Sequence, residues 1–169
     1  MEILSQQANA IPDRATSIAF RKVMEPFYGR MRSMGFSSAG LVISSTTTKV
    51  KTGASDWYGI AAGKLQKVTA GTDMPALVGT VTNGKFNAFV FFIDKAGTVY
   101  SQMMNEGATL NAVTFKSGDD DMAVLGFVII NPTGTGNFVG GTTPLGDGTV
   151  VPNAVYINTL SAFEPTATI

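Results

Sequence analysis

The chain has 169 residues, of which 44% are hydrophobic and only 14% are charged, with a formal net charge of zero. Zero net charge argues against general binding to nucleic acid or to an anionic membrane, and the lack of Cys and His excludes thiol chemistry, disulfides and the commonest general base. Because an average globular protein has about 25% charged residues, we expect this single domain to hide surface by oligomerisation or by docking on a partner.

The first 36 residues have a charge pattern of their own. They contain all four Arg and one Lys against three acids, a net charge of +2, whereas the remainder has seven Lys against nine acids. Arg is suited to forked contact with carboxylates. We therefore divide the chain into a basic arm, residues 1–36, and a body, residues 37–169, and expect the arm to touch an acidic surface. The sequence shows neither a signal peptide nor a transmembrane run, so we expect synthesis in the cytoplasm without secretion.

A short helix is predicted within about residues 14–34 of the arm. Apolar residues recur there at approximate i, i+4 spacing, namely Ile18, Val23, Phe27, Met31 and Met34. Pro26 is expected to kink or divide this helix, and Gly35 to end it. The helix either packs on its own domain or docks on a neighbouring subunit. For docking, the candidate contact residues are Arg14, Ile18, Arg21, Val23, Phe27, Arg30, Met31 and Arg32.

The body is predicted to be all-β, an antiparallel β-sandwich or barrel behind the short helical arm. Short runs rich in β-branched and aromatic residues alternate with Gly, Asn, Asp and Pro turns, at the spacing typical of such folds. The candidate strands are Leu41–Ser45, Lys49–Thr52, Trp57–Ile60, Leu65–Thr69, Ala76–Val81, Asn87–Ile93, Thr98–Gln102, Ala112–Phe115, Ala123–Ile130, Asn137–Val139 and Ala154–Asn158.

Two of these candidate strands contain a run that is apolar on both faces, Phe89–Ile93 in the first and Val124–Ile130 in the second. Such a strand lies either between two layers of a fold or against a partner subunit. The first of them is followed by Thr98–Gln102 after a turn, which makes this pair the best hairpin in the chain. Together with the low charge, these strands favour a homo-oligomer.

Two motifs resemble ligand sites without meeting their requirements. The glycine-rich run Gly134–Gly141 has neither the Gly-Lys-Ser/Thr ending of a P-loop nor the GxGxxG spacing, so we expect β-turns with positive φ at several glycines. Asp119–Asp121 are adjacent and lack the alternation of a calcium loop, so we expect a solvated turn. We therefore expect no metal and no cofactor.

Catalytic pairs are hard to assemble from these residues, so we expect that the chain is not an enzyme. Without His or Cys, a hydrolase needs paired carboxylates or a Ser–Lys couple. Ser44 lies near Lys49 in sequence, but nothing distinguishes the two from a polar strand face. The aromatic pair Trp57 and Tyr58 has no basic groove beside it, so we expect core or interface packing, with carbohydrate contact as the alternative.

The C-terminal half carries motifs in a distinctive order. They are an apolar strand ending in Asn131-Pro132, then Phe138-Val-Gly-Gly-Thr-Thr143, then a short loop, then Asn153-Ala-Val-Tyr156. This order, within residues Phe86–Pro165, resembles a family of small head-associated structural proteins of tailed bacteriophages. The resemblance implies a decoration, cement or head-fibre subunit on the capsid surface of the virion, with the major capsid protein and further copies of itself, as a homotrimer, for partners.

Two other functions stay open at this point. One is a tail, neck or baseplate component of the same kind of virion, which copy number per particle distinguishes from a capsid protein. The other is a carbohydrate-binding adhesion module, suggested by the tyrosines and the sandwich-like β content. The basic arm has no counterpart in the resemblance, so its expected role as the lattice contact rests on its charges and apolar residues alone.

Overall fold

The computed structural model describes residues 14–116 and 121–160. Within these residues its elements are one α-helix, α2 (Arg14–Met31), one 3-10 helix, η1 (Leu110–Ala112), and eleven strands. In chain order the strands are β1 (Met34–Gly35), β2 (Val42–Ile43), β3 (Val50–Lys51), β4 (Trp57–Ala61), β5 (Lys64–Val68), β6 (Thr80–Val81), β7 (Asn87–Ile93), β8 (Val99–Met103), β9 (Ala123–Ile130), β10 (Phe138–Val139) and β11 (Val155–Asn158). The predicted all-β fold with an N-terminal helix is confirmed.

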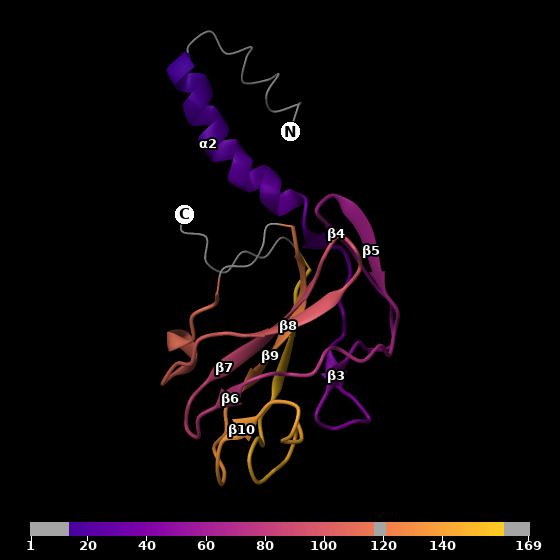
Figure 1. Cartoon of the computed structure of the whole chain (residues 1–169), viewed down its shortest axis with the longest axis vertical. Helices are drawn as coiled ribbons and strands as arrows, with labels where there is room; N and C mark the ends of the chain where they lie inside the picture. The colour runs from indigo at the N-terminus through magenta and orange to yellow at the C-terminus, as the bar shows by residue number, and fades with distance from the viewer. Residues whose placement is uncertain (1–13, 117–120, 161–169) are drawn as a thin grey trace.

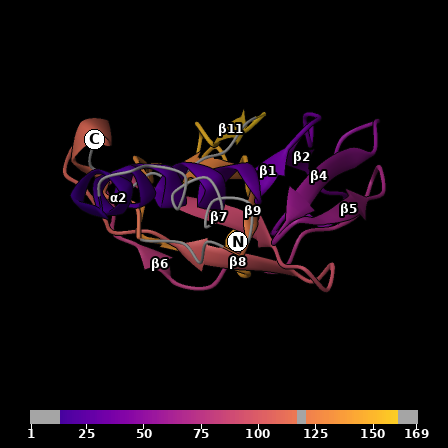
Figure 2. The ribbon, with the colours of Figure 1, turned by 90° about the horizontal axis from the view of Figure 1, so that it is seen from above.

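All strand pairs are antiparallel and form four sheets in the described part of the chain. The largest sheet has the order β11-β9-β7-β8, a second has the order β1-β4-β5, and two small sheets pair β10 with β6 and β2 with β3. Figure 2 shows the three-stranded sheet standing to one side of the four-stranded sheet. The arrangement is sandwich-like, as the strand spacing predicted.

The main core lies between these two larger sheets. Phe89, Phe91 and Ile93 of β7 belong to it from one sheet, and Trp57 of β4 belongs to it from the other. Phe89 also makes an edge-to-face contact with Phe138 of β10, with ring centroids 5.9 Å apart. Burial of these large side chains is the main stabilising term of such a fold.

The opposite face of the four-stranded sheet is covered by a smaller cluster. Val90 and Phe92 of β7 lie there with Met104, and Val113 and Phe115 pack against them. Every residue of β7 is therefore buried, and the sequence prediction of a strand buried on both faces is confirmed. The β7–β8 hairpin is confirmed as well, with Phe92 opposite Tyr100.

Three details of the helix and strands differ from the sequence prediction. Of the two outcomes predicted for Pro26, a kink or a division, division does not occur, because the loss of one hydrogen bond leaves the helical hydrogen bonds on either side of the proline intact and α2 is one helix from Arg14 to Met31. The helix ends at Met31 and not at Gly35, because Gly35 pairs with Gly59 in a strand. Ala112–Phe115 is no strand, since Val113 N donates to Leu110 O and closes the η1 turn.

The strand predicted at Ala76–Val81 is confirmed only for its last two residues. Ala76 O instead accepts a hydrogen bond from the Ser101 hydroxyl at 2.7 Å, and Gly79 has a φ of +124°. A side-chain hydrogen bond and a left-handed backbone thus replace the hydrogen bonds between strands at residues 76–79. In the glycine-rich run, Gly136 and Gly141 have positive φ, which confirms the predicted turns.

Candidate partner-binding surface

α2 extends away from the β body in Figure 1. Its 18 residues span about 27 Å at 1.5 Å per residue. The helix joins the body through the two residues that follow it. Arg32 Nη2 donates to Ala62 O at 3.3 Å, Gly63 N donates to Arg32 O at 2.8 Å, and Ala62 N donates to Ser33 Oγ at 3.0 Å. The end of the helix is thereby fixed to the β4–β5 turn.

Large apolar side chains are exposed along α2. Ile18 is 47% exposed and Met31 is 53% exposed, and Phe20 and Tyr28 are exposed too. Leaving several such groups in water is costly for a helix of this length, whose stability in proteins comes mostly from packing of its apolar face. The exposed side chains make α2 a candidate for docking against a partner.

The structure describes the side chains of only four of the eight contact residues predicted from the sequence. Ile18 and Met31 are exposed, as docking requires, and Arg21 and Arg32 are half-buried. The side chains of Arg14, Val23, Phe27 and Arg30 lie outside the described part. Sequence reasoning missed Phe20 and Tyr28. The spacing Phe20, Met24, Phe27, Met31 was the signal that could have added the first of these.

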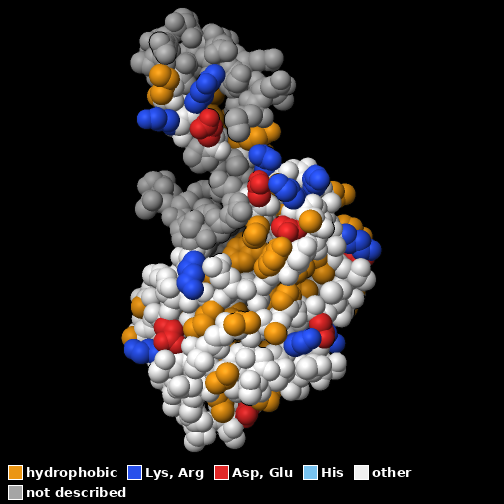
Figure 3. All heavy atoms as spheres, viewed as in Figure 1, with side chains coloured by type: hydrophobic (Ala, Val, Ile, Leu, Met, Phe, Trp, Pro, Cys, Tyr) orange, Lys and Arg blue, Asp and Glu red, His pale blue; other side chains and the backbone are white. Residues whose placement is uncertain are grey.

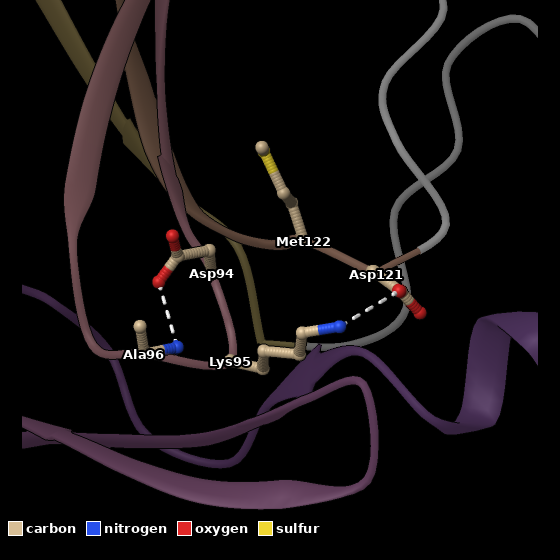
Figure 4. Close-up of a pocket in the computed structure, with 5 residues that line it drawn as sticks. All are labelled: Asp94, Lys95, Ala96, Asp121 and Met122. Atoms are coloured by element: carbon tan, nitrogen blue, oxygen red, sulfur yellow. Dashed lines mark hydrogen bonds and ion pairs between the residues drawn. The ribbon is translucent and has the colours of Figure 1, made fainter.

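A small pocket of about 220 Å³ lies at the turn between β7 and β8 (Figure 4). Asp94, Lys95, Ala96, Asp121 and Met122 line it. The Asp94 carboxylate accepts hydrogen bonds from Ala96 N at 2.8 Å and, outside the lining set, from Thr98 N and the Tyr100 hydroxyl at 2.9 Å each. Lys95 Nζ lies 3.8 Å from Asp121 Oδ2.

These bonds decide what the pocket can do. The Thr98 backbone bond, followed by that from Tyr100, lowers the pKa of Asp94 below its usual 3.8, so this carboxylate stays ionised and holds the turn. A general acid needs the opposite, a raised pKa. The residues 14–116 and 121–160 also contain no group of three acids that could hold a metal ion. Asp119 and Asp120 of the predicted solvated turn lie outside the described residues.

Replacing Asp94 with Asn tests the role of this carboxylate in the turn. Because the folded-state pKa of Asp94 is lowered, its charge stabilises the fold at pH above 3.8, and this contribution is lost as the pH falls through the folded pKa. We expect Asp94→Asn to be less stable than wild type near neutral pH and the difference to shrink on acidification. Urea unfolding of both proteins near neutral pH and below pH 3.8 measures the difference in the free energy of unfolding. A difference that is independent of pH contradicts the assignment.

The other candidates from the sequence are placed within the fold. Trp57 is fully buried in the main core, whereas the Tyr58 hydroxyl faces Asp56 Oδ2 at 3.4 Å. The Ser44 hydroxyl donates to Asp73 Oδ1 at 2.6 Å, so its partner is a carboxylate and not one of the lysines. No helix in the described part is long and apolar enough to span a bilayer. Comparison with family models, curated proteins and solved structures finds no match for the chain.

Proposed function

We propose that this chain is a structural protein of a tailed-bacteriophage virion, which decorates or cements the capsid by bridging major capsid subunits. The observation that carries the proposal is the helix α2, which projects from an all-β body and exposes apolar side chains such as Ile18 and Met31. The motif order in the C-terminal half, which resembles small head-associated phage proteins, supports the same function.

The charge of α2 favours an acidic partner surface. The helix has four cations, Arg14, Arg21, Lys22 and Arg30, against the single acid Glu25. Arg–carboxylate pairs fix orientation through forked hydrogen bonds, although exposed pairs contribute only about 0–1 kcal/mol each. Most of the affinity therefore comes from burial of the apolar side chains, at about 25 cal/mol per Å².

Cementing, which is stabilisation of the assembled capsid, follows from the state of the capsid protein to which this chain binds. A subunit that binds the assembled capsid and not free capsid protein shifts the equilibrium toward the assembled state by mass action. The proposed location is the outer capsid surface, reached after synthesis in the host cytoplasm. A rigid sandwich-like body is suited to this role because it holds the contact surfaces at fixed spacing.

Electron cryo-microscopy of intact particles tests the proposal. We expect density for this chain at regular positions of the head lattice, with α2 against the capsid surface. Density at the tail, neck or baseplate instead supports the alternative virion role. Particles that lack the chain altogether contradict both assignments.

We also propose that the protein is a homotrimer. Low charge and many exposed large hydrophobic residues favour self-association, and the resemblance to decoration proteins supplies the number three. Light scattering of the purified protein is expected to give roughly three times the 17.7 kDa of one chain. A molar mass equal to that of one chain at all concentrations contradicts the prediction.

A further inference from the structure

The three-stranded sheet has one face in the core and one face in solvent. Along β4, Trp57 and Ala61 are buried, whereas Tyr58 and Ile60 between them are not. On the neighbouring strand β5, Val68 is buried opposite Trp57. Along β4 the register therefore divides the side chains into an inner and an outer set.

The outer set is mostly apolar, with Lys67 of β5 as its charged member. The strand register places Met34 and Leu65 on either side of Ile60, and Phe36 N donates to Tyr58 O at 2.8 Å, which brings Phe36 beside Tyr58. We call these five residues the outer patch. Leu65 is 71% exposed, Phe36 is 52% exposed and Tyr58 is 42% exposed. An antiparallel sheet normally presents polar side chains to water, so this face is an exception.

Three cations lie next to the outer patch. Lys67 of β5 is opposite Tyr58 on the outer face, the exposed Lys64 stands at the start of β5 beside the β4–β5 turn, and Arg32 bonds to Ala62 O of that turn. Asp56 pairs with Lys67 at 2.7 Å, which lowers the pKa of Asp56 and raises that of Lys67, so this pair adds no net charge. Arg32 and Lys64 leave the rim with a net positive charge. Figure 3 shows orange apolar side chains next to blue cationic ones over the β4–β5 hairpin. The rim complements an acidic surface.

The composition and geometry favour a protein over a lipid surface. Aromatic residues, Met and Arg are enriched in the cores of protein interfaces, and the outer patch contains Tyr58, Phe36 and Met34. Tyr58 is also held in place by its neighbours. Lys67 Nζ lies 5.8 Å from the centre of the Tyr58 ring while it pairs with Asp56. A fixed arrangement of this kind suits a partner of defined shape more than fluid lipid headgroups.

We propose that the outer patch is a docking surface for an acidic protein partner. It is continuous in the chain with α2, since Met31, the exposed last residue of the helix, precedes Met34 by three residues. The inference rests on the proposed function, in which that partner is the capsid. It adds a second contact surface, on the rigid body, to the projecting helix.

The test compares Leu65→Glu with Val78→Glu in the full-length protein. Leu65 and Val78 are 71% and 74% exposed, but Val78 lies outside the outer patch. Glu at position 65 places a charge within the apolar contact and opposite an acidic partner. We expect Leu65→Glu to bind heads assembled without this chain about tenfold more weakly than wild type, or about 1.4 kcal/mol, with Val78→Glu unchanged. Thermal melting verifies that both variants are folded.

Each outcome decides between the proposals. If wild type and Leu65→Glu bind heads equally, or if Val78→Glu is weakened as much, the outer patch is not the docking surface and the decoration function stands. If wild type does not bind heads, both proposals fall. Vesicles of phosphatidylcholine and phosphatidylserine form the second arm. Binding of wild type to these vesicles and not to heads identifies an anionic membrane as the partner and overturns the protein assignment.

Discussion

Deletion of residues 1–31 is expected to remove the protein from phage heads while the β body stays folded. The deletion eliminates α2 with its exposed apolar side chains, and it retains Arg32 and Ser33, which bond to the β4–β5 turn. It also spares β1, which lies within the predicted arm but pairs with β4. Because the apolar side chains supply most of the affinity, we expect a loss of about a hundredfold or more in binding, measured by co-sedimentation with heads.

A matched pair of point variants controls for this deletion. Ile18→Asp places a charge on the exposed face of α2, and Val139→Asp places one on β10, at the opposite end of the molecule in Figure 1. Only the first is expected to weaken binding. If the truncated protein occupies heads at the normal level, α2 is not the anchor. The contact then belongs to the body, at the outer patch or at the turns around Asn131–Gly136 or Asp119–Asp121.

Gly59→Ala is expected to destabilise the fold by about 3 kcal/mol, at the upper end of the range for overpacked cores. A Cβ at this position lies 2.5 Å from Trp57 Cζ2 and 2.7 Å from the backbone oxygen of Met34. Neither group can move easily, because Trp57 is fully buried and Met34 pairs with Ile60. Urea unfolding measures the change in free energy.

Gly148→Ala is the control for this substitution. A Cβ at Gly148 meets nothing within 4 Å, so we expect a change of less than about 0.5 kcal/mol. Trp57→Phe combined with Gly59→Ala supplies the second comparison. The smaller ring vacates the space that the new methyl group needs, so the double variant is expected to be more stable than the sum of the two single changes predicts. Strictly additive losses contradict the steric explanation.

The long strands could be predicted from the sequence and the short ones only in part. Asn87–Ile93 and Ala123–Ile130 match β7 and β9 at both ends, because an uninterrupted apolar run between turn residues leaves few alternatives. Ala76–Val81 shrank to two residues, since its backbone bonds to the Ser101 hydroxyl. Such a bond joins residues far apart in the chain, and no local pattern encodes it.

The candidate surfaces differ in the same way, because one follows from a local sequence pattern and the other from contacts between distant residues. Ile18 and Met31 were predicted as contact residues because helical periodicity is a local signal, and both are exposed. The outer patch was not predicted. Its members Met34, Ile60 and Leu65 become neighbours only through the register of β1, β4 and β5. The sequence pattern marks Ile60 and Leu65 as strand residues and Met34 as a helix residue, and it does not say which face of the sheet stays uncovered.

The complete burial of β7 has a consequence for the synthesis of the chain. β8 follows β7 directly, but β9, the other neighbour of β7, begins only at Ala123. A nascent chain that has emerged no further than β8 therefore presents a hairpin with one apolar edge unpaired, including Phe89, Val90 and Phe91. Unpaired apolar edges of this kind recruit other strands. The interval between the emergence of β8 and that of β9 is thus the period in which the nascent chain is most prone to aggregate.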